Sequence, residues 1–210
     1  DRLYISNAYK KRLNTIGRVE GSCRTKKCIA LTFDDGPDEV VTTQLLDILK
    51  TKSVKATFFV LGNHVVRYPE VVKRVHNEGH EIENHSFDHP DFVKLRNPAK
   101  IRQQIDATQK AVQDTGVGAP LFIRPPYGAV KSDVEKVVGM PIVLWNVDAQ
   151  EWRAGTSSQA VAAAILDKAR NGSIVLMHDT RSVTLEVLPQ VIDDLLLRDY
   201  EFVTVQSLLS

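Results

Sequence analysis

The chain has 210 residues, which is enough for one domain with a large core, and its 27 basic residues are balanced by 26 acidic ones. Charges of both signs are interspersed, so the pattern argues against a nucleic-acid partner. No apolar run approaches the roughly 20 residues that cross a membrane, and no signal peptide is present, so we expect no membrane span in this segment.

From Cys28 onward, short apolar segments rich in branched residues alternate with helical patterns. The predicted strands are Cys28–Phe33, Ala56–Leu61, Glu81–Asn84, Leu121–Ile123, Ile142–Val147, Ile174–Met177 and Phe202–Val205. The predicted helices are Thr43–Thr51, Pro69–Glu78, Pro98–Thr115, Ser132–Val138, Ser157–Arg170 and Thr184–Arg198. About seven strands alternating with helices predict parallel pairing in a closed or nearly closed α/β barrel. We expect one domain over residues 28–210, preceded by an extension over residues 1–27.

Cys23 and Cys28 are the two cysteines of the chain, too few for a cysteine zinc site. Across a short loop they could pair in an oxidising compartment, which would stabilise the fold by about 2 kcal/mol on the loop-entropy model. Two reduced, buried thiols are the alternative, and the sequence leaves both open.

Polar side chains suited to catalysis follow the predicted strands at their carboxyl ends. They are Asp34, Asp35, His85, Arg124, Asp148 and His178. Because the carboxyl ends of parallel strands lie side by side, we expect these residues to converge on one pocket built from strand-to-helix loops. His76 lies inside a helix and His80 precedes a strand, so we expect both to be structural or solvated, whereas His64 is undecided.

His85 and His89 are four positions apart, which places both imidazoles on one face of a helical turn. With one carboxylate from elsewhere they form a set that holds a divalent metal and leaves positions open for water and substrate. Of the neighbouring Asp34 and Asp35, one can bind the metal while the other takes a proton from bound water. A non-haem iron oxygenase uses similar ligands, but a jelly-roll sequence would be expected for it.

Five segments of the chain, in this order, resemble the motifs of the polysaccharide deacetylases of carbohydrate esterase family 4, the NodB homology domain. They are Thr32–Pro37, His85–His89, Arg124–Gly128, Asp148–Trp152 and Leu176–Asp179. The resemblance spans about residues 27–209. It implies a distorted, incomplete (β/α) barrel, in agreement with the alternation of strands and helices.

The resemblance also implies metal-assisted hydrolysis of an N-acetyl or O-acetyl group on a sugar. Asp35, His85 and His89 would bind the metal, usually zinc, with cobalt or another divalent ion as alternatives. Asp34 would be the general base and His178 the general acid that protonates the leaving nitrogen.

Supporting roles follow from the same resemblance. Arg124 would keep Asp34 ionised, while the acidic pair Asp148 and Glu151 would favour the imidazolium form of His178. The backbone N–H of Tyr127 would face the oxyanion, and Leu176 with Trp152 would wall the acetyl methyl pocket. In the family an Asp typically precedes the motif-four tryptophan, so Glu151 is a departure that puts its reach to His178 in doubt.

The function that this resemblance favours is deacetylation of N-acetylglucosamine units in peptidoglycan, by a protein that is extracellular or on the cell surface. Chitin oligomers and acetylated xylan are alternative substrates, because groove-forming loops set the choice. A non-catalytic carbohydrate-binding module is a third reading, but it would need only the metal ligands and not Asp34, Arg124 and His178.

Overall fold

A computed structural model describes Cys23 and residues 25–210 of the chain. The strands are β1 (Lys27–Asp34), β2 (Thr57–Val60), β3 (Glu81–Asn84), β4 (Val147–Asp148), β5 (Ser173–His178) and β6 (Tyr200–Phe202). The helices are α2 (Val41–Thr51), α3 (Gly62–Arg67), α4 (Pro69–Asn77), α5 (Phe92–Leu95), α6 (Pro98–Asp114), α7 (Ser132–Val138), α8 (Ser158–Leu166), α9 (Ser182–Leu197) and α10 (Val205–Leu209), with a 3₁₀ turn η2 at Pro126–Gly128. Nearly all of the predicted extension over residues 1–27 lies outside the described residues.

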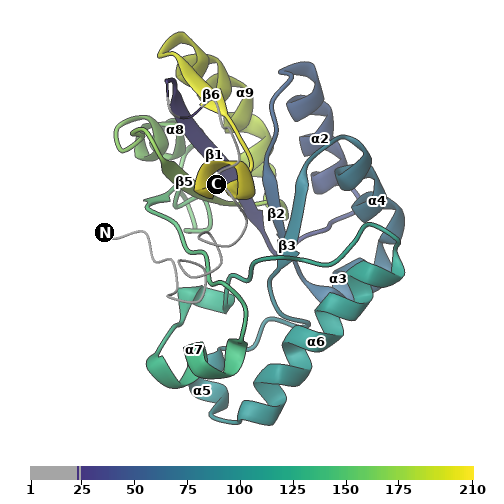
Figure 1. The fold of residues 1–210 in the computed structure, drawn as a ribbon. Coiled ribbons are helices and arrows are strands. Elements are labelled where there is room, and N and C mark those ends of the chain that lie inside the picture. Colours follow the sequence, from purple (N-terminus) through teal and green to yellow (C-terminus); the bar gives the residue numbers. More distant parts are fainter. Residues whose placement is uncertain (1–22, 24) are drawn as a thin grey trace.

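The strands form one six-stranded sheet in the order β3-β2-β1-β5-β4, and β6 pairs with the first residues of β1. All pairings are parallel, and most helices lie around the outside of the strands (Figure 1). The C-terminal helix α10 differs, because its Val205 packs with Ala30 and Phe59. Past the β3 edge, Ile123 bridges to Asn84 on one side and to Ile142 on the other. Val147 then pairs with Val175 of β5, so between β3 and β4 the barrel has only isolated bridges and no continuous ladder. The expected parallel α/β fold with a distorted, incomplete barrel is confirmed.

Three predicted strands differ in the structure. The strand expected over residues 202–205 is observed as β6 at Tyr200–Phe202, and Val205 is instead the first residue of α10. The segment expected over residues 121–123 is reduced to the single bridge at Ile123, and the strand expected over residues 142–147 is divided into the bridge at Ile142 and β4. Pro120 and Pro141 precede these segments, and Pro125 follows the first; proline has no N–H to donate to a ladder. Helices α3, α5 and α10 were not predicted because each is only four to six residues long.

Alternation along the strands separates two cores. Ile29, Leu31 and Phe33 of β1 face the helices and join the main core cluster, while Ala30 packs in a second cluster with Phe122. Because successive side chains of a strand point to opposite faces, Thr32 and Asp34 share the inner face with Ala30. In β5 the same rule places Leu176 and His178 on the inner face with Ile174. The two central strands thus send polar groups to the same open end of the barrel.

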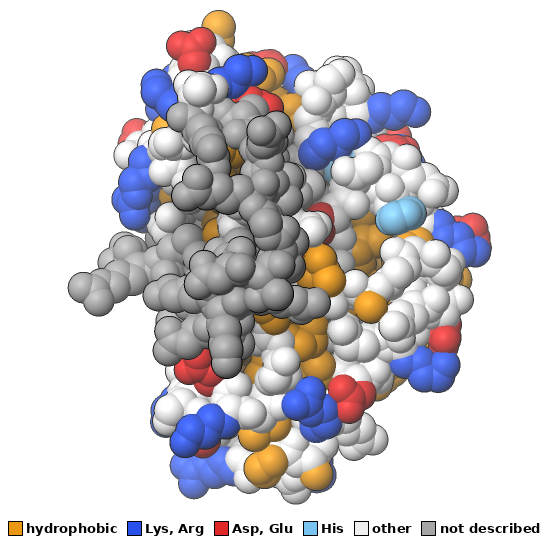
Figure 2. Space-filling model, viewed as in Figure 1, with side chains coloured by type: hydrophobic (Ala, Val, Ile, Leu, Met, Phe, Trp, Pro, Cys, Tyr) orange, Lys and Arg blue, Asp and Glu red, His pale blue; other side chains and the backbone are white. Residues whose placement is uncertain are grey.

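A disulfide joins Cys23 to Cys28 next to the start of β1, with a Cα–Cα distance of 5.4 Å. Of the two states that the sequence left open, the structure has the paired one. None of the helices in the described part of the chain combines the length and the apolar character that crossing a membrane requires. On the face in Figure 2, the basic and acidic side chains of the described residues are interspersed, as their nearly equal numbers suggest.

Candidate active site

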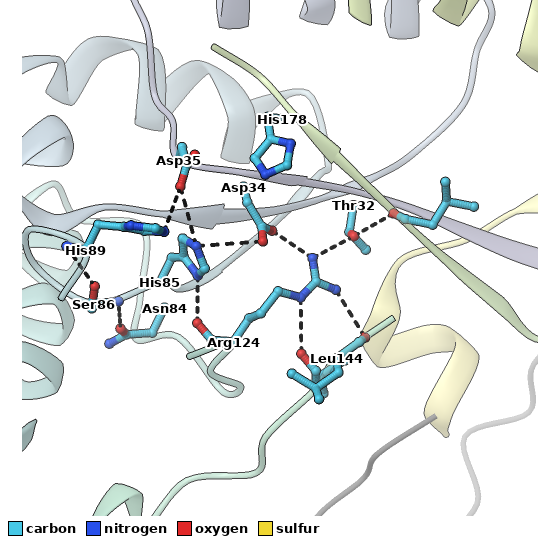
Figure 3. A network of polar contacts seen from close by, with 12 residues as sticks. Thr32, Asp34, Asp35, Asn84, His85, Ser86, His89, Arg124, Leu144 and His178 are labelled. Atoms are coloured by element: carbon cyan, nitrogen blue, oxygen red, sulfur yellow. Dashed lines mark hydrogen bonds and ion pairs between the residues drawn. The ribbon is translucent and has the colours of Figure 1, made fainter. Parts of the chain in front are cut away.

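The three predicted metal ligands converge at the open end of the barrel. Oδ1 of Asp35 lies 3.4 Å from Nε2 of His85 and 3.4 Å from Nε2 of His89. One ligand atom from each residue lies within 4.8 Å of the others (Figure 3). Asp35 Oδ1 is buried and has no hydrogen-bond partner among the described residues. Two imidazole nitrogens and a carboxylate oxygen converging on one point are a donor set that fits a divalent metal.

The expectation that His85 and His89 share a helical turn is wrong. The segment after β3 is an irregular loop, in which Ser86 and His89 have positive φ angles of 72° and 66°. Side chains hold this loop: Asn84 Oδ1 accepts the Ser86 N–H at 2.8 Å, and Ser86 Oγ accepts the His89 N–H at 3.1 Å. These local bonds replace a helix and still bring the two imidazoles together, because side-chain acceptors compete with helical hydrogen bonding.

His85 is oriented by a backbone carbonyl behind it. Its Nδ1 donates to the carbonyl oxygen of Arg124 at 2.6 Å, so Nε2 is the nitrogen that faces the carboxylates. Burial opposes the charged ring, but Asp34 and Asp35 outweigh it and raise the pKa of His85. In Asp35, burial is likewise outweighed by His85, and the pKa is held well below its usual range.

Asp34 is locked to a fully buried arginine. Nη1 of Arg124 donates to Asp34 Oδ1 at 2.7 Å and to Thr32 Oγ1 at 2.8 Å. Its other nitrogens donate to the carbonyls of Val143 and Leu144, both at 3.2 Å. The guanidinium is satisfied on every side, so it can stay charged although burial lowers its pKa. The second oxygen of Asp34 lies 3.7 Å from His85 Nε2 and thus beside the ligand cluster.

His178 lies across the cleft and is bound by one carboxylate of the predicted pair. Its Nδ1 is 2.6 Å from Glu151 Oε1. Burial disfavours the imidazolium, but the Glu151 hydrogen bond and the charge of Asp34 overcome it and raise the pKa of His178 to about 9. The extra methylene of Glu151 therefore does not prevent contact.

The expectation that Asp148 supports His178 directly needs correction. Its Oδ1 accepts the Gln150 N–H at 2.9 Å and the Trp152 indole N–H at 3.2 Å. Asp148 sits at the end of the two-residue strand β4, where its carboxylate turns into the following loop. Its contacts orient Trp152. Within the described chain, only Glu151 of this acidic pair makes a hydrogen bond to His178.

The three metal ligands, Asp34 and His178 face one cleft of about 410 Å³. Its lining is Asp34, Asp35, His85, His89, Tyr127, Gly128, Trp145, Asp148, Trp152, Leu176, His178 and Arg181. Leu176 and Trp152 lie in the cleft as predicted. Tyr127 stands at its edge, 67% exposed, with its ring edge-to-face on His89 at a centroid distance of 4.6 Å. Its φ of 60° comes from the tight η2 turn after two prolines.

Sequence reasoning missed several residues that support the site. Trp145 and Arg181 line the cleft but lie outside the recognised motifs. His64, left undecided, donates from Nδ1 to the carbonyl of Asp35 at 2.9 Å and so holds a ligand's backbone. Its position directly after the second strand was the available signal.

Asp179, which contacts the backbone of Asp34, is another supporting residue that the sequence did not indicate. Its N–H donates to the Asp34 carbonyl at 3.3 Å, and its carboxyl accepts the Thr42 hydroxyl at 2.6 Å. Burial raises the pKa of Asp179 to about 7. A side chain on Gly36 would place Cβ only 2.0 Å from Asp179 Oδ2, so only glycine permits this approach.

The chain is similar to known proteins in sequence and in fold. The family model described as "Polysaccharide deacetylase" matches residues 21–140. The chain is 45% identical to the peptidoglycan-N-acetylglucosamine deacetylase PgdA of Listeria monocytogenes over 185 residues, 88% of this chain and 39% of that protein. The chain thus spans about two fifths of the length of that relative.

Solved structures agree with the family match. The peptidoglycan deacetylase PdaC from Bacillus subtilis is 35% identical with a TM-score of 0.83, covering 88% of this chain and 90% of that one. A family 4 acetyl xylan esterase from Clostridium thermocellum, in complex with a cobalt ion, is 36% identical with a TM-score of 0.83, covering 87% and 90%.

Proposed function

The chain belongs to the polysaccharide deacetylase family, and we propose that it hydrolyses the acetamide of N-acetylglucosamine units in peptidoglycan. One observation carries the proposal: a three-residue ligand cluster, a buried aspartate and a histidine with a raised pKa face the same cleft. Amide hydrolysis of this kind requires a base and an acid beside a metal-ligand set. The charges that surround the base and those that surround the acid must be opposite.

Asp35, His85 and His89 would hold the metal, and zinc suits their mixture of nitrogen and oxygen donors. When bound, such an ion polarises a carbonyl and lowers the pKa of a water that it binds. The hydrogen bond from His85 Nδ1 to the Arg124 carbonyl leaves Nε2 free to act as a ligand.

Asp34 is the base in this proposal. Its ion pair with Arg124 fixes the orientation of the carboxylate, with Oδ2 turned toward the ligand cluster. A carboxylate held there can accept the proton of a water that attacks the acetyl carbon. The backbone N–H of Tyr127 then faces the oxyanion from a turn stiffened by Pro125 and Pro126.

His178 is the acid. An imidazole whose pKa is about 9 is protonated at neutral pH, so it can donate from Nε2 to the departing amine while Glu151 holds Nδ1. Leu176 and Trp152 provide the apolar wall for the acetyl methyl group. A non-catalytic binding module would have no use for the Asp34–Arg124 and His178–Glu151 pairs.

Two substrate alternatives remain in the proposal, chitin oligomers and acetylated xylan. Similarity to an acetyl xylan esterase supports the second, whereas similarity to relatives named as peptidoglycan deacetylases favours peptidoglycan. We place the protein outside the cell or on its surface, because peptidoglycan lies there and because a disulfide is typical of oxidising compartments.

The test is acetate release from peptidoglycan fragments, chitin oligomers and acetylated xylan, each with zinc, with cobalt and with a chelator. We expect the highest kcat/KM on peptidoglycan fragments, and loss of activity with the chelator that zinc restores. No acetate from any substrate, or release unaffected by the chelator, would contradict the proposal.

A further inference from the structure

One charged side chain in the cleft has no partner among the described residues. Among the charged residues of the lining, Asp34 pairs with Arg124, Asp35 lies against both ligand histidines, and Asp148 binds Trp152. His178 is held by Glu151. Arg181, by contrast, is exposed, lines the cleft, and its side chain makes no hydrogen bond or ion pair with the described residues.

The surroundings of Arg181 form a cationic and aromatic rim. Arg181 lies three residues after His178, immediately before α9. Trp152, 43% exposed, lines the same cleft, with its indole N–H fixed by Asp148. The guanidinium of Arg153 lies over the Trp152 ring, 5.1 Å from its centroid. The cleft therefore has acidic side chains at Asp34 and Asp35 and one arginine, Arg181, in its lining, while Arg153 lies over the ring of the lining residue Trp152.

We propose that Arg181 binds a carboxylate on the glycan next to the N-acetyl sugar that is deacetylated, with Arg153 over the Trp152 ring as a second cation. The inference rests on the proposed function and names what selects the substrate. A guanidinium presents donors in a fixed fork that matches a carboxylate, and the neighbouring tryptophan offers a face for a sugar ring. The protein is nearly neutral overall, so this recognition is local.

The chemistry distinguishes the substrate classes. Peptidoglycan alternates N-acetylglucosamine with a sugar that carries a lactyl group, which ends in a carboxylate or continues into a peptide that has carboxylates of its own. Chitin carries neither. A carboxylate subsite at Arg181 thus favours peptidoglycan over chitin without any change in the catalytic residues.

The experiment uses one peptidoglycan oligosaccharide in two forms, with its carboxylates free and with them converted to neutral methylamides. The ratio of kcat/KM for the charged form to that for the neutral form measures recognition of the charge. We expect the parent to prefer the charged form, and this preference to fall about tenfold in Arg181→Gln, since a charge-assisted hydrogen bond contributes about that factor. Arg181→Lys should keep part of the preference, and Arg153→Gln should lower it less.

Arg170→Gln is the matched control, because Arg170 is an exposed arginine just before β5, at the opposite end of the strand from His178. The ratio of kcat/KM for the charged form to that for the neutral form should be the same in Arg170→Gln as in the parent. An unchanged ratio in Arg181→Gln, or an equal fall in Arg170→Gln, would overturn the inference.

Two further comparisons distinguish a failure of the carboxylate subsite from a failure of the proposed function. Oligosaccharides with and without their peptides distinguish the peptide carboxylates from the lactyl carboxylate, and a larger effect of Arg181→Gln on either one supports the subsite. If the parent releases acetate from both forms at equal kcat/KM, the protein is a deacetylase and the carboxylate subsite is wrong. If it releases acetate from neither, the proposed function itself has failed.

Discussion

Two histidines at opposite ends of β3 have opposite environments, although both are buried. His80, just before the strand, accepts the Ala56 N–H on Nδ1 at 3.2 Å and packs edge-on against Phe58. Burial, aided by the charge of Lys55, lowers the pKa of His80 to about 4. His85, just after the strand, faces Asp34 and Asp35, which raise its pKa despite complete burial. Burial alone keeps an imidazole neutral, and nearby carboxylates reverse that effect.

The acidic groups follow the same division. Glu83, inside β3, is buried, and burial together with the charge of Glu81 raises its pKa well above the usual range. It accepts the Phe122 N–H at 2.6 Å and holds the barrel wall. Asp34, at the open end of β1, meets a guanidinium instead. His85 and His178, which lie where strands end at the cleft, have raised pKa values, whereas burial favours the neutral forms of Glu83 inside the barrel and of His80 at the other end.

The largest expected effect comes from removing the open-end histidine. His85→Ala should lose the metal and lower activity roughly a thousandfold, because a metal contributes several kcal/mol to stabilising the transition state. His89→Ala should also lose the metal and lower activity, whereas His80→Asn should keep both the metal and the activity. Elemental analysis and acetate release check this, and full metal occupancy in His85→Ala would rule out the ligand assignment.

Removing the charge of Asp34 should have the next largest effect. Asp34→Asn keeps an oxygen that can accept from Arg124 but cannot take a proton, so we expect turnover to fall by about 10² to 10⁴ with the metal retained. The measurements are kcat and metal content on the same preparation. Near-normal turnover would mean that another group is the base.

Glu151→Gln tests how the raised pKa of His178 arises. The acid must be protonated, so activity should fall as the pH rises through the pKa of about 9. Losing the carboxylate charge lowers that pKa, and the alkaline limb of kcat/KM should move about one unit toward lower pH. Asp148→Asn is the control and should leave the limb in place. A shift in Asp148→Asn but not in Glu151→Gln would reverse the assignment.

The smallest expected effect concerns His80 and stability. Its folded pKa of about 4 lies below the unfolded value of 6.5, so the unfolded chain binds the proton first as the pH falls. The stability that the neutral ring contributes is present above pH 6.5 and is lost between 6.5 and 4. From pH 7 to pH 5 this loss is about 2 kcal/mol. Urea unfolding in chelator should show that His80→Asn loses less stability over this interval than the parent; an equal loss would contradict it.

Much of the site could be predicted because the sequence indicates where each strand ends and in which direction it runs. An apolar run followed at once by Asp34 or His178 marks the carboxyl end of a strand, and parallel strands bring those ends together. The five motifs added the division of roles. The mistake over His85 and His89 had a local cause: spacing four suits a helix, but Asn84 and Ser86 offer side-chain acceptors that stabilise a loop.

The sequence by itself determined the family, the parallel α/β alternation and the set of groups for metal, base and acid, because these depend on residue type and order along the chain. Only the tertiary structure decided which carboxylate reaches His178, that Asp148 turns to Trp152, and that Arg181 lines the cleft. Side-chain reach and direction depend on loops whose shape arises from contacts between segments far apart in the chain. Hence neighbours such as Asp148 and Glu151 look alike in sequence and act on different partners in the fold.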